Sequence, residues 1–337
     1  MAEWLYEDGI GEARAALVED GEILEALVER DDGAPRPGAI LSARYVRAVP
    51  ETNRALLTLD GGAPAWLRPI PPRTAEGALL TVAITREAIP EEGNPKPAFA
   101  RLATPGEAPR PAPSLLDRIG ATPCPIRRLR AHEPDLLEAA GWSELMDEAT
   151  GGLIAFPGGL LRLSLTPAMT LFDVDGSLPP APLAIAGAAA AARAIRRLGI
   201  GGSIGIDLPG APARADRQAA AAQVDALLPQ PFERTAVNGF GFLQIVRPRP
   251  RASLPERLRA DPAATAALAL LRRAERSAGG GRRTLIAAPA VIARIAGAPG
   301  WLEMLGRRLG APTGLREEAG MAISAGDVQV EHPTLQA

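Results

Sequence analysis

The first hundred residues alternate short apolar runs with turn-forming residues, a pattern typical of β-strands. Ala13–Val18 and Ile23–Val28 are two such runs, and the intervening Glu19-Asp20-Gly21-Glu22 predicts a hairpin between them. Short strands at regular spacing favour a small antiparallel barrel in the segment that follows. The five strands expected there lie at residues 40–49, 55–59, 65–67, 79–85 and 97–102.

From residue 134 onward, apolar positions recur at helical spacing and alternate with strand-like apolar runs. This alternation predicts a sheet covered by helices, as in α/β proteins. Helices are expected at 134–149, 183–198 and 214–228, and strands at 160–165, 169–174, 203–206 and 236–246. A smaller α/β unit is expected beyond residue 255, with helices at 262–278, 291–296 and 301–309 and strands at 284–287 and 328–331.

Composition limits the chemistry that the chain can support. With 47% apolar residues among 337, the chain can bury more than one core, which excludes disorder throughout. Cys124 is the single cysteine, so an internal disulfide, a structural zinc site and an iron–sulfur cluster are excluded. The two histidines are His132 and His332, which leaves oxygen ligands for any metal and points to magnesium or manganese.

No membrane segment is expected, because the longest run of small apolar residues, 183–192, is too short for a span. The acidic start of the chain also lacks a signal-peptide pattern, so we expect a soluble, cytoplasmic protein. The net charge of −2 does not indicate a globally basic nucleic-acid binder. Lys96 is the one lysine; the resulting excess of arginine suits phosphate contacts, but a GC-rich genome is the favoured explanation.

Three aspartates form the strongest candidate site. Asp173 and Asp175 lie two residues apart where a strand gives way to a loop, so their side chains share one face. Asp207 directly follows the next apolar strand. Because ligands collect at the carboxyl ends of strands in open α/β sheets, these carboxylates predict a magnesium site that could support phosphodiester hydrolysis. The alternative is that they are turn and cap residues.

Two further groups of residues are candidates for RNA contacts. Arg247, Arg249 and Arg251 alternate with prolines that keep the backbone extended, which suits a phosphate backbone; a solvated loop is the alternative. Small barrels bind single strands through aromatic platforms and basic grooves, and the alternative is a purely structural barrel. The candidates on the barrel are Trp66, Arg86 and Lys96.

Four elements occur in order in the second half: FPGG (156–159), TPAMTLFDVDG (166–176), GGSIGID (201–207) and FGFLQIVRPR (240–249). Together they resemble the ribonuclease E/G family, which has a Gly-Gly strand pair followed by T-x-A-x-T-x-[IF]-D-[VI]-N, G-G-x-I-x-I-D and F-G-x-[LV]-[EQ]-[MI]-x-R-x-R. Residues 2–30 are similar to the opening hairpin of the family. Residues 38–104, above all LLTVAITREAIPEEG, resemble its OB-type RNA-binding insert, and the strand at 284–287 with its following helices resembles its small C-terminal subdomain.

The resemblance implies an α/β fold with an RNase H-like catalytic core, an inserted OB-type β-barrel and a small C-terminal α/β subdomain. The implied divisions are an N-terminal hairpin of the RNase H-like part at 1–35, the barrel at 36–104, a reduced sensor or linker at 105–130, the catalytic core at 131–254 and the subdomain at 255–337.

Site residues follow by position. Asp173 and Asp207 match the magnesium-binding aspartates of the family, and Arg247 matches its active-site arginine near the scissile phosphate. Asp175 stands where the family usually has asparagine, which keeps an oxygen ligand and adds a negative charge. Trp66 and Leu57 stand where the family tends to have base-stacking phenylalanines, and of these two only Trp66 can stack.

The chain departs from the family pattern in three places. The paired-cysteine zinc link expected near 255–265 is absent, so no zinc is expected and any homo-oligomer must form without it. The domain that senses the RNA 5′ end is shortened to about residues 105–130, and Arg73-Thr74 matches its Arg-Thr motif only in letters, because it lies inside the barrel. The loop after Asp175 also differs.

These observations favour a magnesium-dependent endoribonuclease that cleaves single-stranded RNA in RNA processing or decay. Asp173, Asp207 and Asp175 are the expected metal ligands, and Asp173, Asp207 and Arg247 the expected catalytic residues. The expected RNA-binding residues are Trp66, Arg86, Lys96, Arg249 and Arg251. The alternative hypothesis is a non-catalytic RNA-binding protein on the same scaffold, and a third is an assembly protein without RNA affinity.

Overall fold

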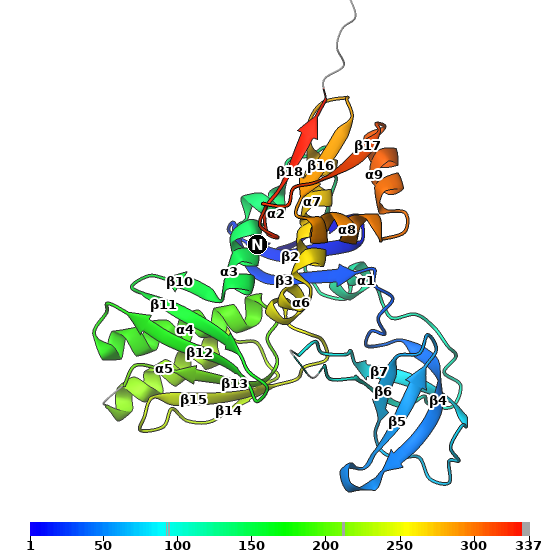
Figure 1. Ribbon diagram of the computed structural model, residues 1–337. Coiled ribbons are helices and arrows are strands. Elements are labelled where there is room, and N and C mark those ends of the chain that lie inside the picture. The colour runs from blue at the N-terminus through cyan, green and yellow to red at the C-terminus, as the bar shows by residue number, and fades with distance from the viewer. Residues whose placement is uncertain (92, 94, 211–212, 332–337) are drawn as a thin grey trace, which may run out of the picture.

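The computed structural model describes residues 1–91, 93, 95–210 and 213–331; His332 lies outside the described residues. Its strands form three open sheets and one closed five-stranded barrel. The barrel projects from the remainder of the chain, and the small C-terminal sheet lies at the opposite end (Figure 1). The predicted mixed α/β architecture with a barrel is therefore confirmed.

The first sheet has the strand order β3-β2-β1-β9. Its strands are β1 (Glu3–Asp8), β2 (Glu12–Glu19), β3 (Glu22–Arg30) and β9 (Ile126–Leu129). Helix α1 (Leu115–Gly120) packs its Leu115 and Ile119 against one face of this sheet. The sequence pattern predicts the β2–β3 hairpin but neither β1 nor β9. The segment 105–130 is predicted as a reduced sensor or linker. In the structure it contributes the strand β9 to this sheet and the helix α1 that packs on it.

The barrel has the strand order β4-β5-β6-β8-β7 and closes on itself. Alternate residues point inward because side chains alternate across a strand, and the interior is filled by small and branched apolar groups. All five predicted strands are present, with the 3₁₀ turn η1 (Pro50–Thr52) after the first. They are β4 (Ile40–Val49), β5 (Arg54–Leu59), β6 (Pro64–Leu67), β7 (Leu79–Arg86) and β8 (Ala98–Leu102).

The largest sheet has the order β10-β11-β12-β13-β15-β14. Its strands are β10 (Leu153–Phe156), β11 (Gly159–Leu165), β12 (Thr170–Gly176), β13 (Gly202–Asp207), β14 (Glu233–Arg234) and β15 (Phe242–Arg247). The predicted strand at 236–246 begins only at Phe242, because residues 238–241 form a turn. Helices α4 (Pro180–Arg197) and α5 (Arg214–Leu227) are present as predicted.

Helix α4 joins the first sheet to the largest sheet. Its alanines are buried because β3 lies on one side and β11 and β12 lie on the other. Gly187 permits the close approach, since a Cβ there would lie 2.3 Å from a methyl carbon of Val174. The predicted helix at 134–149 is divided into α2 (Leu136–Ala139) and α3 (Trp142–Gly151) by Gly141, whose φ of +94° favours glycine.

The face of the largest sheet away from α4 carries partly or fully exposed side chains. Leu171, Asp173 and Asp175 alternate on β12 with the buried Phe172 and Val174. The same alternation on β13 places Ser203, Gly205 and Asp207 opposite the buried Ile204 and Ile206. We call this surface the open face.

The C-terminal subdomain is a three-stranded sheet, β17-β16-β18, with its helices packed around it. The helices packed around it are α7 (Pro262–Arg276), α8 (Pro289–Ala296) and α9 (Trp301–Leu309). Helix α6 (Leu254–Ala260) precedes them and buries Leu254 and Leu258 in the main core with the largest sheet. The strands of the subdomain are β16 (Arg283–Ala287), β17 (Thr313–Glu317) and β18 (Gly326–Val330), of which the sequence pattern misses β17. Among the described residues, no helix is both long enough and apolar enough to span a bilayer.

Candidate active site and nucleic-acid interface

Asp173 and Asp207 are direct neighbours at the carboxyl ends of the parallel strands β12 and β13, where the register pairs one with the other. Neighbouring strands lie about 5 Å apart, so two side chains on the same face can reach one cation. Both residues are on the open face and at least partly exposed. Neither carboxylate has a hydrogen-bond or ion-pair partner within the described part of the chain.

Asp175 follows on the same face of β12 but is already paired. Its carboxylate accepts a hydrogen bond from Nε of Arg162 at 3.1 Å, and both side chains are more than half exposed. Among residues 1–331 as far as they are described, no three acidic, histidine or cysteine side chains gather as a metal-binding group. Asp173 and Asp207 together could hold magnesium, because this ion is commonly held by one or two carboxylates and completed by water.

An aromatic floor adjoins the acid pair. Phe242 is opposite Asp207 in the antiparallel register of β13 and β15. Its ring covers Gly205, because a Cβ at that position would lie 2.5 Å from the ring and 3.0 Å from the side chain of Leu171. Gly205 therefore lets Phe242 lie flat on the open face beside the carboxylates.

Arg247 does not lie near the acid pair, which corrects its predicted role as an active-site arginine. It pairs with Gly202 at the amino end of β13, five residues before Asp207, or about 17 Å along the strand. It also shares the face of the buried Ile245 and donates to the carbonyl of Ile200 at 3.1 Å. Burial lowers the pKa of Arg247. A guanidinium that does share the open face is that of Arg162, which is paired with Asp173 in register.

Arg249 and Arg251 also diverge from the row expected along one side of an extended segment. Arg249 forms ion pairs with Glu256 and, at 3.4 Å, with Glu91. Arg251 is half-buried in a cavity between the barrel and the core, and burial followed by the nearby Arg118 lowers its pKa. The structure therefore places these arginines in contacts between segments and not along a solvent-exposed phosphate track.

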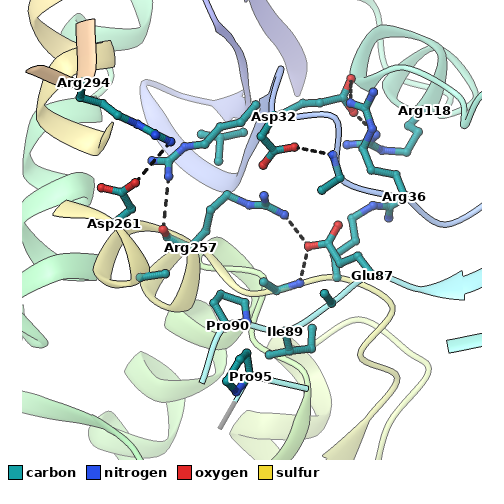
Figure 2. A pocket seen from close by; sticks show the side chains of 18 residues that line it. Asp32, Arg36, Glu87, Ile89, Pro90, Pro95, Arg118, Arg257, Asp261 and Arg294 are labelled. Atoms are coloured by element: carbon teal, nitrogen blue, oxygen red, sulfur yellow. Dashed lines mark hydrogen bonds and ion pairs between the residues drawn. The ribbon is translucent and has the colours of Figure 1, made fainter. Parts of the chain in front are cut away.

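The cavity that contains Arg251 has a volume of about 320 Å³ and lies where the barrel meets the core. Figure 2 shows Glu87, which follows β7, with two of the polar contacts of the cavity made to its carboxylate. The carboxylate of Glu87 accepts hydrogen bonds from the backbone N–H of Ala252 at 2.8 Å and from Arg257. The N–H of Glu87 donates to the carbonyl of Pro250 at 3.0 Å. These contacts connect the barrel to the segment that follows β15.

The outer surface of the barrel carries a row of residues in register across four strands. Leu56 on β5 pairs with Trp66 on β6, Trp66 with Phe99 on β8, and Phe99 with Arg86 on β7. All four side chains are partly exposed. We call this row the barrel platform. In contrast, Leu57 is fully buried inside the barrel and cannot contact a base.

Guanidinium groups surround the aromatic part of the barrel platform. The Cζ atoms of Arg86 and Arg54 lie 4.2 and 5.0 Å from the ring centroid of Phe99, within the range of cation–π contacts. Burial and the neighbouring charges of Arg249 and Arg54 lower the pKa of Arg86. Lys96 lies nearby but is paired with Glu91 at 2.5 Å.

Phe99 and Arg54 belong to this surface although they are not among the RNA-binding residues expected from the sequence. Phe99 lies between two inward-facing alanines, Ala98 and Ala100, and this alternation is the signal for an outward aromatic. Arg54 is marked in the same way as the outward residue before the buried Ala55.

The barrel platform and the acid pair lie toward opposite ends of β13. Arg249 contacts Gly202 at the amino end, because a Cβ there would lie 3.1 Å from its side chain, and the charge of Arg249 acts on Arg86. Asp207 ends the strand. Comparison with models of known protein families finds no match to the chain, and comparison with curated proteins finds none either.

Proposed function

We propose that this protein is a magnesium-dependent endoribonuclease that acts on single-stranded RNA. The observation that carries the proposal is the register pair Asp173–Asp207, two adjacent carboxylates with no donor from the described residues. The order of the sequence elements that resemble the ribonuclease E/G family supports the same activity, and with it an RNase H-like relationship for the α/β core.

Asp173 and Asp207 would hold the ion between their carboxylates. When bound, magnesium supplies a water of lowered pKa and positive charge at the scissile phosphate. Arg162, which is exposed on the same face, is placed to contact a phosphate oxygen once its pairing with Asp175 yields. Phe242 and Leu171 exclude water from one side of the site.

The substrate class follows from the barrel platform. Aromatic faces beside a basic surface bind single strands by stacking and phosphate contacts, with site sizes of roughly 4–16 nucleotides per barrel. Such a length covers the distance of about 17 Å between the two ends of β13. One RNA strand that is held by the barrel platform would thus be long enough to run the length of β13 toward the acid pair.

A second candidate is a non-catalytic RNA-binding protein. Two observations favour it: Asp175, an expected metal ligand, is paired with Arg162, and Arg247, the expected catalytic arginine, lies far from the acid pair. Of the expected catalytic and metal-binding residues, only Asp173 and Asp207 then remain together. This candidate keeps the barrel platform and loses the hydrolytic step.

The deciding experiment incubates an end-labelled, AU-rich single-stranded RNA with the wild-type chain and with Asp173→Asn, in magnesium and in EDTA. The endoribonuclease predicts internal cuts that require magnesium and disappear in the variant, while both proteins still bind RNA in EDTA. Intact RNA with shifted gel mobility under all conditions supports the binding protein. Cleavage retained by Asp173→Asn contradicts the assignment of the site.

A further inference from the structure

Among the described residues after Met1, Phe240 is the most exposed large apolar residue, with 90% of its surface open to solvent. It lies in the turn that precedes β15, two residues before Phe242, which is the register partner of Asp207. The turn therefore carries a free aromatic ring at the same end of the sheet as the acid pair. A ring this exposed has nearly its whole apolar surface free to be buried against a ligand, which would be favourable.

The turn is held in place by its own backbone and by Asn238. The side-chain oxygen of Asn238 accepts hydrogen bonds from the N–H groups of Phe240 at 2.9 Å and Phe242 at 3.0 Å. The N–H of Asn238 donates to the carbonyl of Phe242 at 3.0 Å, and the N–H of Gly241 donates to that of Asn238 at 3.2 Å. The ring of Phe240 thus projects from a well-defined turn, which reduces the entropy that binding would cost.

The turn is also tied to the strand that ends in Asp207. The N–H of Leu208, the next residue, donates to the carbonyl of Gly241 at 3.2 Å. Gly241 has a φ of +91°, and a Cβ at this position would lie 2.4 Å from the carbonyl oxygen of Leu208. Only glycine allows this approach, so the backbone that carries Phe240 keeps a fixed place beside the acid pair.

Resting on the proposed function, we infer that Phe240 stacks on one nucleobase of the RNA next to the phosphate held at Asp173 and Asp207. A nucleobase offers a flat π-face that an exposed phenyl ring can cover, whatever the base. Phe242 and Leu171 already provide an apolar floor on the same end of the open face. Phe240 is therefore a positioning residue. It determines which phosphate of the RNA lies at Asp173 and Asp207, whereas the barrel platform binds another part of the same RNA.

The test uses a single-stranded RNA of about 12 nucleotides, within the site size of such proteins, in which 2-aminopurine replaces one base at a time. Fluorescence is measured in EDTA with the full chain, so that no cleavage occurs. Stacking on Phe240 predicts quenching at one or two adjacent positions that is lost in Phe240→Ala and Phe240→Leu and kept in Phe240→Trp. Trp66→Ala serves as the matched comparison, because it should weaken binding of the whole RNA without removing quenching at those positions once the protein saturates it.

In magnesium, Phe240→Ala should lower the cleavage efficiency roughly tenfold and spread the cuts over neighbouring positions, since one stacked base contributes about that factor. Binding with the same quenching profile in wild type and Phe240→Ala overturns this inference alone. Loss of a dimer in Phe240→Ala, with unchanged fluorescence and cleavage, overturns it in favour of a protein interface. If quenching depends on Phe240 but the protein never cleaves RNA, the stacking is supported and the proposed nuclease activity is contradicted. If the protein does not bind RNA at all, both proposals are contradicted.

Discussion

Asp173 and Asp207 stand side by side on parallel strands, and each lacks a donor among the residues that the structure describes. Two negative charges at this spacing repel each other and weaken the pairing of β12 with β13 unless a cation neutralises them. Under the proposed function, the stability of the largest sheet should depend on whether Asp173 and Asp207 hold magnesium. This dependence can be measured without any RNA.

Magnesium is expected to raise the melting temperature of the wild-type protein, and Asp173→Asn is expected to abolish this rise. In EDTA the variant should melt about 2 °C higher than wild type, because one like-charge pair costs up to about 1 kcal/mol. Thermal melts over a magnesium titration provide the measurement. Asp175→Asn is the control, since it breaks the pair with Arg162 and leaves Asp173 and Asp207 in place; equal magnesium responses in Asp173→Asn and wild type would contradict the proposed site.

Trp66→Ala should weaken binding of single-stranded RNA by roughly tenfold, because one base-stacking contact is worth about 1–3 kcal/mol. Trp66→Phe should retain most of the affinity. Fluorescence anisotropy with a labelled RNA in EDTA measures the change. Leu79→Ala is the matched control, because Leu79 is also an exposed apolar residue of the barrel but lies at the opposite end of β7 from Arg86. Equal losses in both variants would place the RNA elsewhere on the barrel.

Glu12 is a buried carboxylate that joins β2 to β3 and α7 through Arg30 at 3.0 Å and Arg272 at 2.7 Å. Burial by itself raises the pKa of Glu12, but the guanidinium groups of Arg272 and Arg30 outweigh this, so the pKa lies below its ordinary value. Glu12→Gln leaves two buried cations without their anion and should lower the free energy of unfolding by about 3 kcal/mol at pH 7.

The effect of Glu12→Gln should depend on pH in a defined direction. Because the folded-state pKa is depressed, the stabilisation by Glu12 is present above its unfolded-state value of about 4.3 and is lost as the pH falls through the folded-state pKa. Urea unfolding at several pH values from neutral to acid should show wild type and variant converging below about pH 4. A constant difference across that range would show that the charge of Glu12 is not the cause.

Arg283 holds the loop before β16 through backbone acceptors. Its side chain is 1% exposed and donates to the carbonyls of Ser277 at 3.0 Å, Gly279 and Gly281. Arg283→Met leaves these carbonyls without donors and should destabilise the subdomain by about 3 kcal/mol. Arg283→Lys should recover little, because an ammonium group cannot reach several fixed acceptors at once. Hydrogen exchange of β16 and β18 measures the effect, and unchanged protection in both variants would contradict it.

Periodicity along the chain was enough to predict the barrel strands, the long helices and the strands β11 to β13. Each of these elements carries its own alternation or helical spacing, which burial of one face requires. Five strands, β1, β9, β10, β14 and β17, are not predicted, because they are short or begin in polar segments and gain their place in a sheet from their partner strands. Helix α4 was predicted, but its burial on two sides follows from the sheets that enclose it.

The position of aspartates directly after two apolar strands already indicated that Asp173 and Asp207 could meet, since parallel strands end at the same edge. Strand register, and the face of the sheet to which a side chain points, decide which arginine lies near these aspartates. Arg247 was selected from sequence, yet the antiparallel pairing of β15 with β13 carries it to the far end and to the opposite face. Arg162 and Phe240 reach the site because strand pairing and a glycine turn bring distant segments together, and no local pattern of residues encodes that contact.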